Sequence, residues 1–147
     1  MLKLFSIVLL VLSSVPAFAA RDEIEGPVSA KIIRIIDGDT LLVAATPWPQ
    51  QTMEVYVRIR GIDAPEIHSK CAEVRKAALE ARVALEQMIS GAANIQLREI
   101  AGDKYFGRIL ANVTFADGRN PAQYLLSEGK VRAYDGGRKP QVVCADE

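Results

Sequence analysis

The sequence predicts one α+β domain: a five-stranded OB-fold barrel, with one long helix between the third and fourth strands and a second helix after the fifth. Two observations lead to this fold class. Five short segments are rich in β-branched residues and separated by turn residues, and two segments with helical periodicity lie between and after them. The length of 147 residues suits a single domain.

The first three strands come early in the chain. Residues 28–36 (VSAKIIRII) are strongly β-branched, residues 37–39 (DGD) signal a tight turn, and residues 40–45 resume a strand, which together predict a hairpin. A loop at 47–50 (PWPQ) follows. Residues 53–62 then alternate between apolar and polar, as a half-buried strand does. The apolar face of that alternation holds Met53, Val55, Val57 and Ile59.

A long helix is expected over about residues 70–89, with Ser69 as its N-cap and a stop at 90–91 (SG). Its apolar residues recur at alternating spacings of three and four, which places them on one stripe. The stripe consists of Cys71, Val74, Ala78, Ala81, Leu85 and Met88.

Two further strands are expected at 95–100 and 109–115. Asn120 then provides a cap and Pro121 a first-turn proline for the second helix, which Gly129 ends. With the order strand, strand, strand, helix, strand, strand, helix, we place the domain at residues 27–135 and a C-terminal tail at 136–147.

The N-terminus has the pattern of a secretory signal peptide over residues 1–19. Lys3 precedes a largely apolar run at 4–12, and residues 17–19 (AFA) supply a small-x-small cleavage site after Ala19. A membrane anchor is the alternative, but the run is well short of the roughly 20 residues that span a bilayer. We therefore expect an exported, periplasmic or secreted, protein with no membrane span after cleavage.

The charge balance of the chain says less about its function than the N-terminal pattern does. The chain has 18 basic and 18 acidic residues, which excludes a protein that holds nucleic acid by bulk charge. Acidic residues gather at both ends of the mature chain, and the body from Gly26 to Cys144 holds 16 basic and 13 acidic residues. Any binding of a polyanion must come from a local patch.

The two cysteines are Cys71 and Cys144. In an oxidising compartment an isolated pair more often forms a disulfide than a reactive site, although two free thiols are the alternative. A bridge would tie the tail to the start of the long helix. A zinc site is not expected, because no Cys-x-x-Cys spacing exists and His68 is the single histidine.

Two aspartates at strand ends suggest a metal site. Asp39 and Asp63 come from separate loops, and hard carboxylates of this kind suit Ca²⁺ or Mg²⁺. Pro65 favours an extended backbone at Ala64, whose carbonyl could serve as a third oxygen ligand. Taken alone, each aspartate is ordinary turn chemistry.

Neighbouring charged residues favour the metal hypothesis and add phosphate chemistry. Arg58 lies on the polar face of the strand that delivers Asp63, and Arg108 enters the last strand. Two guanidinium groups can pair with phosphate oxygens and stabilise the charge that grows in a transition state. Glu66, three residues past Asp63, is the candidate that orients or deprotonates water. We expect His68 to be solvated and to have no role in the mechanism.

Four segments, in order, resemble the staphylococcal nuclease (thermonuclease) family. The resemblance covers roughly residues 28–134. The segments are IIRIIDGDTLLV (32–43), VRIRGIDAPE (57–66), DKYFGRILANV (103–113) and NPAQYLLSEGKVRAY (120–134).

This resemblance implies an OB barrel with packed helices and calcium-dependent cleavage of DNA and RNA that leaves 3′-phosphorylated ends. It also implies roles for residues that match the family's pattern. These are Asp39, Asp63 and the Ala64 carbonyl for the metal, Arg58 and Arg108 for phosphate, and Glu66 as general base.

The chain departs from the family in several places. The family often has threonine where Ala64 stands, and a third helix has no evident counterpart. Phe106 is an extra residue, so the nucleotide-contacting places fall either to Lys104 and Tyr105 or to Tyr105 and Phe106. Tyr134 is a candidate for stacking on a base.

Our leading hypothesis is therefore an exported, monomeric, thermonuclease-like endonuclease that hydrolyses phosphodiester bonds with Ca²⁺. One alternative is an OB barrel in the cell envelope that binds single-stranded nucleic acid or an oligosaccharide without cutting it. A second is a structural protein in which the metal only stabilises the barrel.

Overall fold

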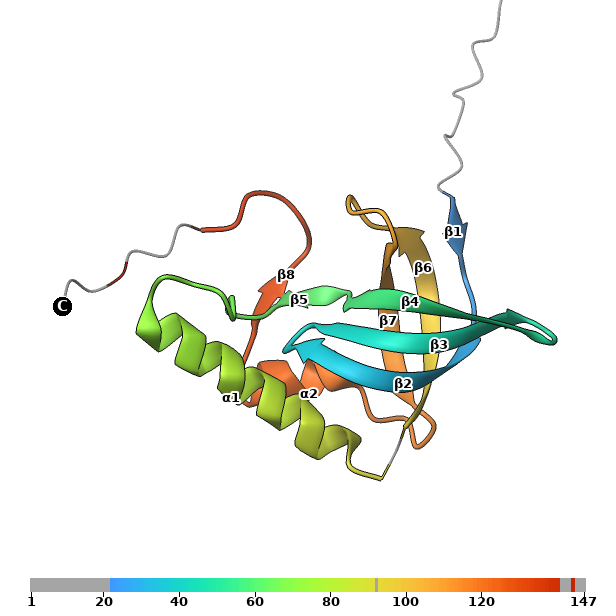
Figure 1. The fold of residues 1–147 in the computed structure, drawn as a ribbon, viewed down its shortest axis with the longest axis horizontal. Coiled ribbons are helices and arrows are strands. Elements are labelled where there is room, and N and C mark those ends of the chain that lie inside the picture. Colours follow the sequence, from blue (N-terminus) through green and yellow to red (C-terminus); the bar gives the residue numbers. More distant parts are fainter. Residues whose placement is uncertain (1–21, 92, 141–143, 145–147) are drawn as a thin grey trace, which may run out of the picture.

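The structure is a computed structural model that describes residues 22–91, 93–140 and 144 (Figure 1). The signal peptide predicted at residues 1–19 lies outside the described residues. The strands are β1 (Glu23–Ile24), β2 (Val28–Asp37), β3 (Thr40–Trp48), β4 (Gln51–Ile59), β5 (Gly61–Asp63), β6 (Asn94–Gly102), β7 (Arg108–Phe115) and β8 (Arg132–Tyr134). The helices are α1 (Ala72–Ile89) and α2 (Pro121–Ser127).

Five strands close into a barrel. β2 pairs with β3 and β3 with β4, both antiparallel, while β4 pairs with β7 in parallel. β7 then pairs with β6, and β6 returns to β2, which closes the ring. Because parallel neighbours need a long crossover, β4 and β7 are separated in sequence by β5, α1 and β6. This arrangement confirms the predicted OB-fold barrel, with its two helices where the sequence placed them.

The core fills the barrel and the space under α1. Leu41 and Val43 of β3 and Val57 of β4 are almost fully buried, and they share one cluster with Ala81 and Leu85 of α1. The predicted alternation holds only in the inner half of β4. Met53 is 56 % exposed, because the β3–β4 hairpin extends beyond the barrel (Figure 1).

The strand predicted at residues 53–62 proves to be two strands. β4 ends at Ile59, and β5 begins at Gly61, which has a φ of 85° that favours glycine. β5 then leaves the barrel and pairs with β8 in a small two-stranded sheet, with Asp63 opposite Arg132. The spacing of apolar residues changes at the same point, from two between Val57 and Ile59 to three between Ile59 and Ile62.

The predicted N-cap of the long helix was wrong by two residues. Cys71 occupies that position without a side-chain cap, while the Ser69 hydroxyl accepts a hydrogen bond from the Cys71 N–H at 3.2 Å. Ser69 therefore forms a local turn instead of starting the helix. The cap of α2 is as predicted, since the Asn120 side chain accepts a hydrogen bond from the Gln123 N–H.

A disulfide joins Cys71 to Cys144, with their Cα atoms 5.5 Å apart, and so confirms the predicted pairing. It fastens the end of the tail beside the first turn of α1. Within the described part of the chain, no helix is long and apolar enough to cross a membrane.

Candidate active site

Asp39 lies in the turn between β2 and β3 and is buried. Its Oδ1 accepts a hydrogen bond from the Thr40 hydroxyl at 2.8 Å, and its Oδ2 accepts one from the Ala64 N–H at 2.7 Å. The carboxylate therefore links the first hairpin to the end of β5, although residues 39 and 64 are far apart in sequence.

Gly38 explains how this turn comes so close to the helix. A Cβ at this position would lie 2.7 Å from the Ala81 Cβ and 3.0 Å from the Ala64 Cβ, closer than side chains normally approach. The absence of a side chain lets the turn sit against α1 and brings Asp39 to the backbone of Ala64.

Arg58 bridges the two aspartates. Its Nη1 donates to Asp39 Oδ1 at 3.1 Å, and its Nη2 donates to Asp63 Oδ1 at 2.8 Å. The strand register explains the position of Arg58, because it lies directly opposite Thr40 on the neighbouring strand. A largely buried guanidinium between two buried carboxylates is a charge-assisted network.

Asp63 receives two further cations. Its Oδ2 accepts two hydrogen bonds from Arg132, one from Nε at 2.9 Å and one from Nη2. Its Oδ1 contacts the Lys139 ammonium. Neither residue was predicted from the sequence. Arg132 is found only through the pairing of β5 with β8, and Lys139 lies in a turn-rich tail that carries no local pattern.

The two aspartates respond differently to this environment. Burial, followed by repulsion from Asp37, raises the pKa of Asp39 to about 6. The positive charge of Arg58 acts in the opposite direction but does not outweigh them. Burial also opposes ionisation of Asp63, but hydrogen bonds and charges from Lys139, Arg132 and Arg58 outweigh it and hold the Asp63 pKa below its usual value. A cation placed near Asp39 would favour its charged form.

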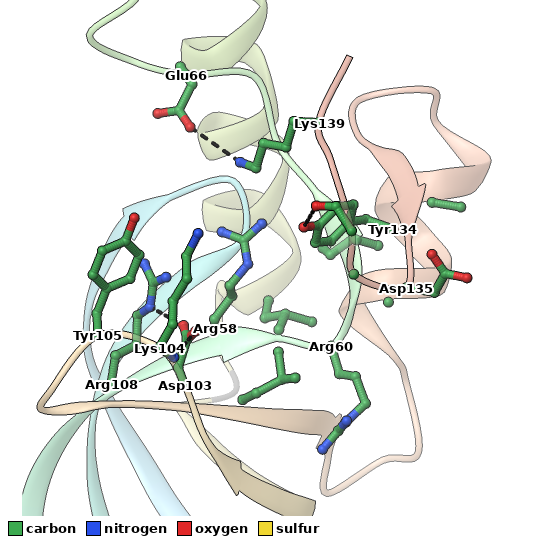
Figure 2. Close-up of a pocket in the computed structure, with 17 residues that line it drawn as sticks. Arg58, Arg60, Glu66, Asp103, Lys104, Tyr105, Arg108, Tyr134, Asp135 and Lys139 are labelled. Carbon is green, nitrogen blue, oxygen red and sulfur yellow. Dashed lines mark hydrogen bonds and ion pairs between the residues drawn. The ribbon is translucent and has the colours of Figure 1, made fainter. Parts of the chain in front are cut away.

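A cleft of about 1360 Å³ opens beside this network. The three predicted catalytic residues, Arg58, Glu66 and Arg108, all line it (Figure 2). The register places Tyr56 opposite Arg108 on the parallel pair β4–β7, so Arg58, two residues further on, lies on the same face as Arg108.

The predicted substrate-binding residues line the same cleft (Figure 2). The Arg108 Cζ lies 4.6 Å from the centre of the Tyr105 ring, and the Lys104 Nζ lies 5.0 Å from it. Asp103, which was not predicted as a site residue, accepts a hydrogen bond from Arg108 Nε. Tyr134 lies across the cleft and donates its hydroxyl hydrogen to the Gly137 carbonyl at 2.8 Å.

A second cavity of about 730 Å³ lies between the start of α1, β8 and the tail. Two residues line both cavities, Glu66 and Lys139, and their charged ends are 3.4 Å apart. His68 lines the second cavity and is exposed, as predicted.

The site therefore combines buried aspartates, cleft-lining arginines and an exposed glutamate. A family model described as "Staphylococcal nuclease homologue" matches residues 56–144, more than half of the chain. The chain belongs to the staphylococcal nuclease family. The match includes Arg58, Asp63, Glu66 and Arg108, while Asp39 lies just upstream of it. No curated protein matches the chain significantly. Membership of the staphylococcal nuclease family indicates a nuclease-like or OB-fold nucleic-acid-related function.

Staphylococcal nuclease homologues are typically calcium-dependent. Here Asp39 and Asp63 supply carboxylate oxygens, which are the donors that Ca²⁺ prefers, so the residues fit the ion in kind. Yet every oxygen of both carboxylates already accepts a hydrogen bond from the protein. Among the described residues, no group of three or more acidic, histidine or cysteine side chains is arranged to hold a metal.

Proposed function

We propose that this protein is an exported, calcium-dependent nuclease that hydrolyses phosphodiester bonds of DNA or RNA. The observation that carries the proposal is the gathering of Arg58, Arg108 and Glu66 on one cleft, next to the buried pair Asp39 and Asp63. Few chemistries other than phosphoryl transfer need two guanidinium groups, an exposed carboxylate and a hard-cation site together.

Arg108 is the residue we assign to the scissile phosphate. Asp103 holds its Nε, which leaves the Nη nitrogens for two phosphate oxygens. Arg58 uses both Nη nitrogens on Asp39 and Asp63, so its contribution to phosphate binding requires part of that network to open. Both guanidinium groups stabilise negative charge that grows during attack.

Glu66 is the residue we assign to the attacking water. Its side chain is 71 % exposed and borders the cleft, so it can reach a water molecule beside the phosphate. A carboxylate in this position orients the water and accepts its proton.

Ca²⁺, held by Asp39, Asp63 and the Ala64 carbonyl, would supply Lewis-acid polarisation of a phosphoryl oxygen. Lys104, Tyr105 and Tyr134 also line the cleft, and cationic and aromatic groups of this kind bind the backbone and bases of nucleic acid. The disulfide supports export, because such bonds persist in oxidising compartments.

The test is hydrolysis of heat-denatured DNA by protein lacking residues 1–19, with Ca²⁺ and with a chelator. We expect cleavage that needs Ca²⁺ and falls by roughly 100-fold or more in Arg108→Ala and in Glu66→Gln. The matched controls are Arg34→Ala and Glu54→Gln, both exposed and outside the cleft, which should keep wild-type activity. Absence of cleavage by folded protein, over neutral to alkaline pH, would refute the proposal.

One observation favours a second candidate, a binding module that does not cut. The carboxylates of Asp39 and Asp63 already form ion pairs with Arg58, Arg132 and Lys139, so the protein itself supplies counter-charges where a metal would bind. Such a module would bind single-stranded nucleic acid or an oligosaccharide in the same cleft, ignore chelator and form no product.

A further inference from the structure

Lys139 stands in contact with two residues of the proposed catalytic machinery. Its ammonium contacts Asp63 Oδ1. It also lies 3.4 Å from Glu66 Oε1, and Figure 2 shows this second pair. It thus neutralises one proposed metal ligand and the proposed general base at the same time. It also lies with Glu66 between the two cavities, since these two residues line both.

The other cations of the site are held more firmly. Arg58 extends from a barrel strand and makes two hydrogen bonds, and Arg132 lies opposite Asp63 on a paired strand. Lys139 belongs to no helix or strand, and its ammonium is a point charge on a flexible stem. Of the three cations, Lys139 is therefore the one that an incoming divalent ion can displace at least cost.

The disulfide keeps Lys139 near the site even when its contacts are broken. Cys144 is fixed beside Cys71, and five residues of chain span at most about 18 Å. A tethered group of this kind has a high effective concentration at its site, so it competes more strongly than a free amine would.

We propose that Lys139 is a resident cation of the carboxylate site, which Ca²⁺ must displace, and that the Cys71–Cys144 disulfide strengthens this competition. The inference rests on the proposed calcium site. It makes the tail a determinant of how much Ca²⁺ the protein needs.

The experiment is a calorimetric titration of Ca²⁺ into the oxidised protein without residues 1–19, compared with Lys139→Gln. We expect the variant to bind Ca²⁺ about 10-fold more tightly, which corresponds to about 1.4 kcal/mol, because an ammonium that touches a ligand repels the incoming ion. The matched control is Arg138→Gln, which removes the same charge one residue earlier, from an exposed side chain. It should change the affinity by less than about 2-fold, since exposed charges are screened.

Equal effects of the two substitutions would overturn the inference, because bulk charge alone would then explain them. Unchanged or weaker Ca²⁺ binding in Lys139→Gln would overturn it as well. Ca²⁺ binding that responds to Lys139 without any DNA cleavage would support the inference and refute the proposed function. Absence of Ca²⁺ binding in all three proteins would overturn both.

The disulfide is tested by the double variant Cys71→Ser, Cys144→Ser, with its fold checked by circular dichroism. We expect Ca²⁺ affinity to rise towards that of Lys139→Gln, and the effect of adding Lys139→Gln to shrink. If the folded double variant binds Ca²⁺ as the wild type does, the tether has no part in the competition.

Discussion

Gly38→Ala should destabilise the protein, although the backbone conformation of Gly38 is open to any residue. The new methyl group would lie 2.7 Å from the Ala81 Cβ and 3.0 Å from the Ala64 Cβ, where ordinary contacts are 3.4–4 Å. Neither neighbour has a flexible end that can move away, so the turn and α1 must separate. Overpacking of this kind costs about 1–3 kcal/mol.

Alanine also restricts the unfolded chain, which stabilises a protein by about 0.4–1 kcal/mol where the site accepts it. The net loss should therefore be about 1–2 kcal/mol in the free energy of unfolding. Urea-induced unfolding followed by far-UV circular dichroism measures this loss, provided that the slope of the transition is unchanged. The matched control is Gly102→Ala, because a Cβ at Gly102 meets no atom within 4 Å. It should be neutral or slightly stabilising.

A double-mutant cycle with Ala81→Gly separates crowding from other causes. Ala81→Gly alone should cost about 2 kcal/mol, from lower helix propensity and a lost buried methyl group. If the two methyl groups collide, the double variant loses less stability than the sum of the single variants, by about 1 kcal/mol or more. Additivity, or a Gly38→Ala protein more stable than the wild type, would refute the steric explanation.

Three further predictions concern stability. Replacing Cys71 and Cys144 by serine should lower the free energy of unfolding by about 4 kcal/mol, because the bridge closes a loop with a sequence separation of 73 residues; a loss below about 1 kcal/mol in urea unfolding would contradict this. Leu85→Ala, at a fully buried position of α1, should cost about 2–5 kcal/mol, while Leu79→Ala, 52 % exposed on the same helix, should change stability by less than about 0.5 kcal/mol. Equal thermal shifts in these two variants would show that the core assignment is wrong. Asn120→Ala should cost about 1 kcal/mol through loss of the α2 cap, and Asn120→Asp should restore most of it.

Local patterns were sufficient for the barrel and the helices. The β-branched run of β2 and the Asp-Gly turn after it describe neighbouring residues, and the structure agrees with both. The predicted stripe of α1 is buried from Ala78 onwards, while Val74 is only partly buried and Cys71 precedes the helix. The failures lie where local signals compete. Ser69 has the chemistry of a helix cap but forms a turn. The run predicted as one strand divides at Arg60, where the alternation stops, since the next apolar residue after Ile59 is Ile62.

The residues of the candidate site also divide into those that the sequence predicts and those that it does not. Asp39, Asp63 and Arg58 were recognisable because each lies at a strand end or on a polar strand face, in segments that resemble one family. Arg132 and Lys139 were not, because their contacts with Asp63 span 69 and 76 positions and depend on how β8 and the tail are placed. No spacing rule links residues so far apart.

The sequence by itself determined the fold class, the family and the types of chemical group available, since these follow from periodicity, turn residues and short motifs. Only the tertiary structure decided how the charges are partnered. In it, two buried aspartates share one guanidinium, and a lysine from the disulfide-tied tail occupies the same site. The physical reason is that buried carboxylates require counter-charges, and the barrel's closure and the tail's attachment determine which cations can reach them.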